Sequence, residues 1–270
     1  AIDSWAEHVE AIEARGLRVE GASGDRTVRI HASTDPAKAG VCDLVVIATK
    51  AMHVESAAAS AKPLIGANTQ VVTIQNGLGS ADRVANALTG TPVIIGVAGG
   101  FGASIKDAGH AHHNGMELIR LGNRDGAVTP ELKAIAEVWE GAGFKVRVFD
   151  DIAQLVWEKL ICNVCFSAST ALTEWTIGQV MAGADTWRMA SGCAVEAYRV
   201  ARAKNIVLSF DDPVDYVRDF GSKIPGAYSS LALDLMAGRA SEIDAINGAI
   251  PPAGQEVGVE APYNETVSAL

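Results

Sequence analysis

Residues 43–49 read Asp-Leu-Val-Val-Ile-Ala-Thr, so five apolar residues stand together without an intervening polar one. A strand with one face in water alternates apolar and polar side chains, whereas a strand covered by helices on both faces does not. The run therefore predicts a parallel strand that is buried on both faces.

Strand and helix patterns alternate along the chain on either side of this run. Strands that alternate with helices predict a doubly wound, Rossmann-like parallel sheet. An antiparallel-looking segment at 112–121 is the exception. We expect strands at 17–19, 27–31, 70–74, 92–97 and 144–149, and helices at 4–16, 54–61, 81–88 and 130–142.

The strand patterns stop near residue 150, and the remainder of the chain has helical periodicity. We therefore predict two domains, a dinucleotide-binding Rossmann-like domain at 1–150 and an all-helical substrate and catalytic domain at 151–270. This combination is typical of a nucleotide-dependent enzyme. The helices are expected at 151–170, 187–204, 212–220, 228–236 and 242–257.

The composition narrows the choice of partners. The chain has 270 residues, a formal net charge of −10 and no Lys/Arg cluster, which argues against nucleic acid and anionic membranes. No apolar run approaches the roughly 20 residues of a membrane span, and the N-terminus does not resemble a signal peptide. Four cysteines in mostly apolar surroundings favour a cytoplasmic protein. The partner is expected to be a small molecule, and the apolar last helices allow a homodimer.

The glycine fingerprint of dinucleotide-binding folds, G-x-G-x-x-G, is missing from the sequence. Asn76-Gly77-Leu78-Gly79 follows an expected strand and could bind phosphate, but a plain strand-to-helix turn explains it better. We therefore expect a first β–α unit with the glycine loop before Ala1. Asp3 then stands where such folds place the acid that binds a ribose hydroxyl.

Residues 156–167, Val-Trp-Glu-Lys-Leu-Ile-Cys-Asn-Val-Cys-Phe-Ser, predict an uninterrupted helix. Lys159 and Asn163 are four residues apart and share one face of it. Partial burial lowers the pKa of an ammonium toward the range of a general acid. The alternative is a lysine whose stem packs on the helix while its head stays in water.

Four segments in this order resemble the ketopantoate reductase (2-dehydropantoate 2-reductase) family and cover most of the chain. They are Asp43–Ala51 (DLVVIATKA), Gln75–Gly79 (QNGLG), the W-E-K-L-I-x-N of Trp157–Asn163, and Ser229–Gly248 with S-S-L-x-x-D-L-x-x-G-R-x-x-E-I-D-x-I-N-G.

The resemblance implies hydride transfer from NAD(P)H to a small branched 2-keto acid, 2-dehydropantoate, in pantothenate biosynthesis. Lys159 matches the general acid, and Glu242 an acid near that lysine and the cofactor. Asn163, Ser230 and Asn76 match substrate-binding positions. The implied cofactor-binding residues are Asp3, Lys50, Asn76, Gly77 and Glu242.

Two departures from the family pattern concern specificity. Ala227 and Ser167 stand where family members often carry asparagines, so recognition of a hydroxylated keto acid should be altered. NADP is the family's usual cofactor, but Asp3 resembles an acid that favours NAD. The alternatives are a related 2- or 3-hydroxyacid dehydrogenase, or a non-catalytic relative that senses the cofactor. A sensor could lose Lys159 and Glu242, whereas this chain keeps both.

Two motifs invite other interpretations. His110 and His112 share one strand face, but no carboxylate or cysteine stands nearby in the sequence to complete a metal site, so no metal is expected. Cys162 and Cys165 have the spacing of a redox motif but lie in mid-helix, where such motifs do not function.

Overall fold

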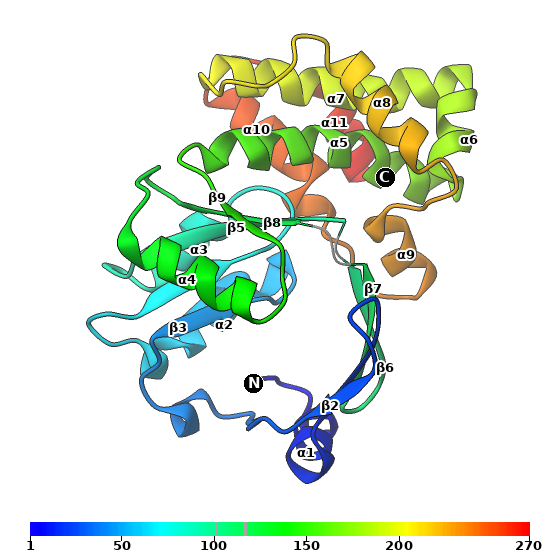
Figure 1. The fold of residues 1–270 in the computed structure, drawn as a ribbon. Coiled ribbons are helices and arrows are strands. Elements are labelled where there is room, and N and C mark those ends of the chain that lie inside the picture. The colour runs from blue at the N-terminus through cyan, green and yellow to red at the C-terminus, as the bar shows by residue number, and fades with distance from the viewer. Residues whose placement is uncertain (101, 116–117) are drawn as a thin grey trace. The chain divides into compact units, whose positions relative to one another are not determined.

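The computed structural model describes residues 1–100, 102–115 and 118–270, and its contacts divide the chain into two compact units. The first unit comprises Ala1–Thr49, Val54–Ile74 and Ala81–Ile152, and it contains both β-sheets. The second unit comprises Lys50–His53, Gln75–Ser80 and Ala153–Leu270, and it is helical (Figure 1). Two short loops from the N-terminal half therefore belong to the helical unit by their contacts.

A five-stranded sheet forms the centre of the first unit, with the order β3-β4-β5-β8-β9. The first three strands run parallel, β8 is antiparallel to β5, and β9 is parallel to β8. The α/β prediction is confirmed, but the sheet is mixed because no helix crosses over between β5 and β8. The strands are β3 (Leu44–Ile47), β4 (Gln70–Thr73), β5 (Val93–Gly99), β8 (Leu118–Asn123) and β9 (Val146–Val148).

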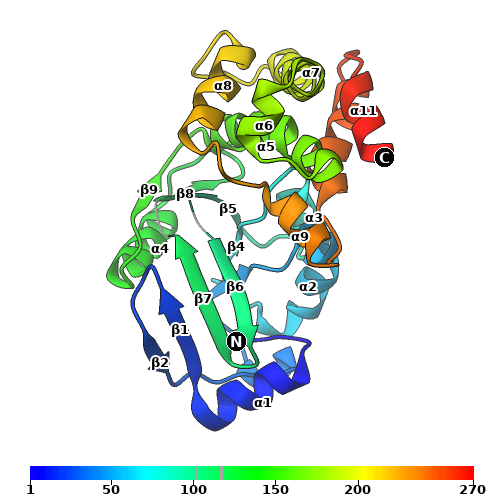
Figure 2. The same cartoon turned by 90° about the vertical axis from the view of Figure 1, so that its right-hand side faces the viewer.

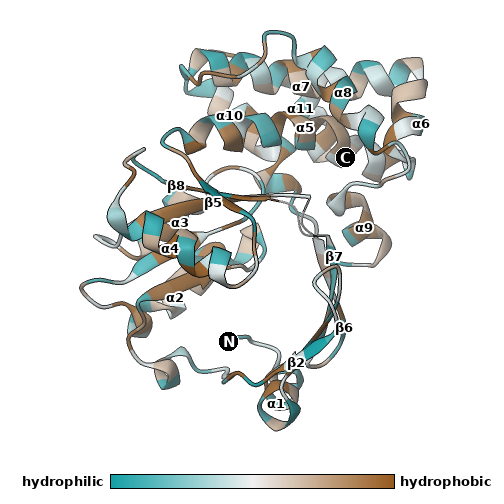
Figure 3. Ribbon diagram, viewed as in Figure 1, coloured by the Kyte–Doolittle hydropathy of each residue, from teal (hydrophilic) through white to brown (hydrophobic). Residues whose placement is uncertain are grey.

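Helices cover both faces of this sheet. Val71 and Val93 pack in one apolar cluster with α2 (Val54–Ser60) and α3 (Ser80–Ala87), while their neighbours Val72 and Ile94 pack in a second cluster with α4 (Pro130–Gly141). Successive side chains of a strand point to opposite faces, so unbroken apolar runs are needed here. Figure 3 shows these strands coloured as hydrophobic.

β3 is the edge strand of the sheet and departs from the prediction for residues 43–49. Val45 and Ile47 are buried, but Val46 is 42% exposed. Val46 lines a cavity of about 880 Å³ that Ile2, Asp3 and Ser33 also line. The prediction of burial on both faces is therefore wrong at Val46, because the face of the edge strand that carries it borders a cavity.

A second sheet of four strands has the order β2-β1-β7-β6, in which β1 and β7 are parallel (Figure 2). The expected single segment at 112–121 is two strands, β7 and β8, in different sheets, and residues 116–117 between them lie outside the described residues. The sequence pattern did not predict β6. The bounds of the four strands of this sheet, and of the helix and short 3-10 helices of the unit not yet given, are α1 (Ala6–Arg15), β1 (Leu17–Gly21), β2 (Arg26–Val28), β6 (Gly102–Asp107), β7 (His110–Gly115), η1 (Pro36–Ala39) and η3 (Lys62–Leu64).

The helical unit is built around α5 (Ile152–Thr173), whose side chains form much of its apolar core. By length and composition α5 could cross a membrane, but most of it is buried inside this unit. The helix expected at 242–257 is divided instead into two 3-10 turns and α10, because Ile246 leaves helical geometry and Pro251 and Pro252 follow. The other elements are η2 (Ala51–His53), α6 (Ile177–Ala182), α7 (Ala184–Ala203), α8 (Pro213–Lys223), α9 (Ser230–Met236), η4 (Ile243–Ala245), η5 (Asn247–Ala249), α10 (Ile250–Gln255) and α11 (Pro262–Ala269).

Candidate active site

Lys159 and Asn163 interrupt the buried surface of α5. From residue 157 to residue 170 every side chain of this helix is buried except these two, which are half-buried. They are four residues apart, so they stand one turn above the other on the same side. The helix therefore presents an ammonium and an amide together at one opening in an otherwise closed surface. The predicted partial burial of Lys159 is confirmed.

The neighbour of Lys159 has a different task. Glu158 is only 9% exposed, and its Oε1 accepts hydrogen bonds from the Ser209 amide at 2.8 Å and from Gln154 Nε2 at 2.9 Å. Its carboxylate is thus committed to holding the loop between α7 and α8. Of the two adjacent charged residues, Lys159 is therefore the candidate for chemistry.

The cysteines of α5 are poor nucleophiles. Burial raises the pKa of Cys162 to about 12, and burial likewise raises the pKa of Cys165 well above its usual value. A thiol needs a lowered pKa and access to solvent to act in redox chemistry. The structure therefore assigns both cysteines to the core.

The loop that carries Asn76 is fixed by its backbone. Gly77 has a φ of +86°, and an added Cβ would lie 2.0 Å from the carbonyl oxygen of Ala245. The next residue, Leu78, donates its amide to the same carbonyl oxygen at 2.9 Å. Only glycine permits this approach. Because the Leu78 amide is used within the protein, the turn interpretation explains Gly77 better than a phosphate loop does.

Glu242 holds the loop that follows β3 and carries Lys50. Its Oε1 accepts a hydrogen bond from the Ala51 amide at 2.7 Å, directly after Lys50. Glu242 is half-buried and precedes η4, the turn to which Leu78 is bonded. The loops that carry Lys50 and Asn76 are therefore held by one short segment, 242–245. A pairing of Glu242 with Lys159 stays a prediction.

Lys50 bonds to a carboxylate whose role the sequence analysis missed. Its Nζ donates to Asp234 Oδ2 and lies 3.4 Å from the Ala240 carbonyl oxygen. Arg239 Nε donates to the other oxygen, Oδ1, at 2.8 Å. Burial alone would raise the pKa of Asp234, but the hydrogen bonds from Lys50 and Arg239 outweigh it and hold that pKa below its usual value. Asp234 lies three residues after the buried Leu231, on the same face of α9. A charged residue on the apolar face of a helix is the sequence signal that could have revealed the cluster of Asp234, Lys50 and Arg239.

Ser230 is the exposed first residue of α9, and its neighbour Ser229 caps the helix. The Ser229 hydroxyl accepts from the Ala232 amide at 3.1 Å and receives a hydrogen bond from Thr170 at 2.7 Å. Ser229 is thus structural, whereas the Ser230 hydroxyl stands at the surface beside it. Ser167 is buried in α5, and its carbonyl accepts from Ser229 at 3.3 Å.

Ala227 lies just before this turn and is half-buried against the apolar core of the helical unit. It offers a methyl group where the family pattern often has an amide. The backbone remains engaged, since its carbonyl oxygen accepts from the Ile177 amide at 2.9 Å. The surroundings of position 227 are therefore apolar.

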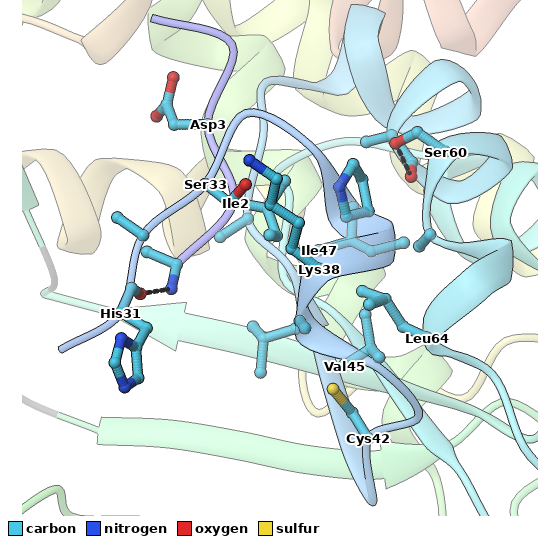
Figure 4. Close-up of a pocket in the computed structure, with 18 of the residues that line it drawn as sticks. Ile2, Asp3, His31, Ser33, Lys38, Cys42, Val45, Ile47, Ser60 and Leu64 are labelled. Atoms are coloured by element: carbon cyan, nitrogen blue, oxygen red, sulfur yellow. Dashed lines mark hydrogen bonds between the residues drawn. The ribbon is translucent and has the colours of Figure 1, made fainter. Parts of the chain in front are cut away.

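Asp3 belongs to the first unit and is exposed at the border of the 880 Å³ cavity (Figure 4). Its Oδ1 accepts the Trp5 amide at 2.9 Å, just before α1 begins. The cavity runs along β3 and reaches Ala48 and Thr49 just beyond its carboxyl end, which is the end at which such folds bind cofactors. The position of Asp3 in a ribose site, and the glycine loop expected before Ala1, both stay predictions.

The histidines of β7 lie close to a carboxylate that the sequence analysis did not anticipate. Glu20, on the parallel strand β1, has oxygens 3.1 Å from His110 Nε2 and 3.3 Å from His112 Nδ1. The hydrogen bond from His112 lowers the pKa of Glu20. Within the described ranges, no three or more His, Cys, Asp or Glu side chains are grouped so that they could hold a metal ion.

Comparisons of the sequence and of the structure with known proteins agree on one family. Residues 1–126 match the family model described as ketopantoate reductase PanE/ApbA, and residues 151–270 match its C-terminal model. The structure of a PanE/ApbA family ketopantoate reductase from Ralstonia eutropha JMP134 is 32% identical in sequence and superposes with a TM-score of 0.88. The match covers 97% of this chain and 86% of that one.

Two further proteins extend the comparison. The 2-dehydropantoate 2-reductase of Streptococcus pyogenes serotype M3 is 27% identical over 270 residues, which are the whole of this chain and 87% of the relative. A D-mandelate dehydrogenase solved with NADH and anilino(oxo)acetate shares the fold, with a TM-score of 0.88 at 24% identity. That match covers 99% of this chain and 87% of the other.

Proposed function

The chain belongs to the ketopantoate reductase family, and on this premise we propose that it reduces a small branched 2-keto acid with NAD(P)H. The family consists of pyridine-nucleotide oxidoreductases. The observation that carries the proposal is the pair Lys159 and Asn163, the two half-buried side chains in the otherwise buried stretch 157–170 of α5. The substrate that the family resemblance implies is 2-dehydropantoate.

The reaction places negative charge on the carbonyl oxygen of the substrate, and a positioned ammonium can stabilise that charge and supply the proton. We assign this task to Lys159. Asn163, one turn further, would hold a polar group of the same substrate, and the exposed Ser230 hydroxyl would hold another. The half-buried position of Lys159, one turn from Asn163 on the same face of α5, supports the assignment.

The residues around Lys50 and Asn76 fit the nicotinamide end of the cofactor. Both follow neighbouring parallel strands, and the loops that carry them are held by hydrogen bonds to Glu242 and Ala245. The cofactor supplies the hydride when it is bound. The protein's part is to fix Lys50, Asn76 and Glu242 beside it. Asp3 would bind the ribose, which would favour NAD over NADP.

The substrate pocket differs from the family pattern at two positions. Ala227 is half-buried against the apolar core and Ser167 is buried within α5. A site that lacks these amides discriminates less strongly in favour of a hydroxylated keto acid. The second candidate function is therefore a related hydroxyacid dehydrogenase that acts on a less polar substrate. All four cysteines are free, which suits the proposed cytoplasmic location.

The test is to follow nicotinamide absorbance at 340 nm with ketopantoate and unhydroxylated branched 2-keto acids, using NADPH and NADH in parallel. Lys159→Ala should lower kcat by about 10²–10⁴-fold, because a general acid contributes that much. Lys223→Ala is the matched control, since Lys223 is an exposed lysine of the same unit whose ammonium pairs with Asp219. Cofactor binding without turnover of any keto acid would contradict the proposal and favour a cofactor sensor.

A further inference from the structure

The sequence at the end of α9 folds into a turn that returns the chain over Asp234. Gly238 has a φ of +67°, its amide donates to the Leu235 carbonyl at 2.9 Å, and the Arg239 amide donates to the Asp234 carbonyl at 2.8 Å. This is the Schellman arrangement, in which a glycine ends a helix and the next residue bonds back to its last turn. Arg239 is thereby placed so that its side chain meets the carboxylate of the residue to which its own amide is bonded.

Asp234 then has both oxygens engaged by cations. Lys50 occupies Oδ2 and Arg239 occupies Oδ1, while Asp234 itself is only 8% exposed. The two cations remain more open, with side-chain exposures of 36% for Lys50 and 57% for Arg239. The buried carboxylate of Asp234 thus holds the side chain of Lys50, which lies in the loop after β3.

Residues 240–242, which follow Arg239, also contact the Lys50 side chain and the backbone next to it. The Ala240 carbonyl oxygen lies 3.4 Å from Lys50 Nζ, and Glu242 accepts the Ala51 amide. A free lysine side chain has many rotamers, so it loses conformational entropy when it is fixed. Asp234 fixes it before any ligand arrives, which lowers the cost of binding.

We infer that Asp234 is a positioning residue, which acts on cofactor binding through Lys50 and does not itself touch the substrate. The inference rests on the proposed function, because it assigns Lys50 to the cofactor. A carboxylate that served stability alone would change the melting temperature and leave the kinetic constants of the folded enzyme unaltered. A positioning carboxylate changes the KM for the coenzyme and spares kcat.

The experiment compares the variants Asp234→Asn, Lys50→Met and the double variant with the wild type. We expect Asp234→Asn to raise the coenzyme KM about tenfold or more, with kcat and the keto-acid KM within about threefold. The double variant should be no worse than Lys50→Met alone, since two residues that act as one are not additive. Asp234→Glu should recover part of the loss. Coenzyme affinity is also measured directly, from the fluorescence of bound NAD(P)H.

Matched controls separate this role from general loss of charge. Asp219→Asn removes an exposed carboxylate of the same unit that pairs with Lys223, and it should leave all constants unchanged. Arg239→Gln keeps the bond between Lys50 and Asp234, so its effect should be smaller than that of Asp234→Asn. Lys50→Met keeps the bond between Asp234 and Arg239, which provides a folded variant if Asp234→Asn is unstable.

The outcomes distinguish the two proposals. An active wild type with an unchanged coenzyme KM in Asp234→Asn overturns the positioning role alone. Effects of Asp234→Asn and Lys50→Met that multiply also overturn it, since Asp234 would then act independently of Lys50. A wild type that binds neither coenzyme overturns the proposed function and this inference together.

Discussion

Gly77 lies so close to Ala245 that a Cβ at position 77 would stand 2.0 Å from the carbonyl oxygen of Ala245. The contact joins the Asn76 loop to the turn that follows Glu242, and the Leu78 amide completes it at 2.9 Å. One small residue thus determines whether Asn76 is held in the candidate active site.

Gly77→Ala should therefore abolish most activity, because the loop must move away from Ala245 to accommodate a methyl group. A positive φ alone costs about 1–2 kcal/mol for an alanine. Gly90→Ala is the control, since Gly90 has a φ of +82° and open space around its Cβ position. Both variants are compared by kcat/KM and by melting temperature. Equal effects of the two substitutions would show that strain, and not the contact with Ala245, is responsible.

Acid should weaken the cluster around Asp234. Its pKa is lowered in the folded protein, so its stabilising contribution is fully present above the unfolded pKa of about 3.9 and is lost as the pH falls through the lower, folded value. The difference in melting temperature between wild type and Asp234→Asn should accordingly be constant from pH 6 to 8 and shrink below about pH 4. A difference that grows on acidification would mean that the cations do not stabilise the ionised carboxylate.

Sequence reasoning succeeded where one periodicity governs a long element. The strands expected at 70–74 and 92–97 correspond to β4 and β5, and the shared face of Lys159 and Asn163 followed from helix geometry. These features depend only on neighbours along the chain.

The features that were missed depend on residues far apart in the sequence. Asp234 and Lys50 are separated by 184 positions, and Glu20 reaches His112 across 92. No local pattern reports such pairs. The exposure of Val46 was missed for the same reason, because an apolar run does not reveal whether its strand lies at the edge of a sheet. Next to the break at Ile246, the side-chain amide of Asn247 donates to the Val164 carbonyl oxygen at 2.9 Å, which is another contact between distant residues.

Glu196 should be important for stability although it lies outside the candidate site. It is 4% exposed and accepts hydrogen bonds from the Tyr263 amide at 2.8 Å and from the Asn264 amide and side chain at 2.9 and 2.8 Å. The carboxylate thus caps the first turn of α11. Glu196→Gln replaces one acceptor oxygen by a donor, so we expect a loss of about 1–3 kcal/mol in the free energy of unfolding.

Urea denaturation measures this loss, with Glu137→Gln as the control because Glu137 is exposed in the middle of α4. The control should remain within about 0.5 kcal/mol of the wild type. If Glu196→Gln unfolds at the same urea concentration as the wild type, the three hydrogen bonds do not hold α11 in place.

The thiols provide a test of the helical core by chemical reactivity. Burial raises the pKa of Cys162 and of Cys193 to about 12, and it also raises the pKa of Cys165. At pH 8 a thiol with such a pKa is ionised in only about one molecule in 10⁴, and the thiolate is the reactive form. A native sample treated with a thiol-specific disulfide reagent should therefore react first at Cys42, which is partly exposed.

Cys42→Ser should remove the fast phase, and urea should expose the three remaining thiols. A fast phase that persists in Cys42→Ser would show that α5 or α7 opens in the native state, and Lys159 and Asn163 would then not be held on a closed helix surface.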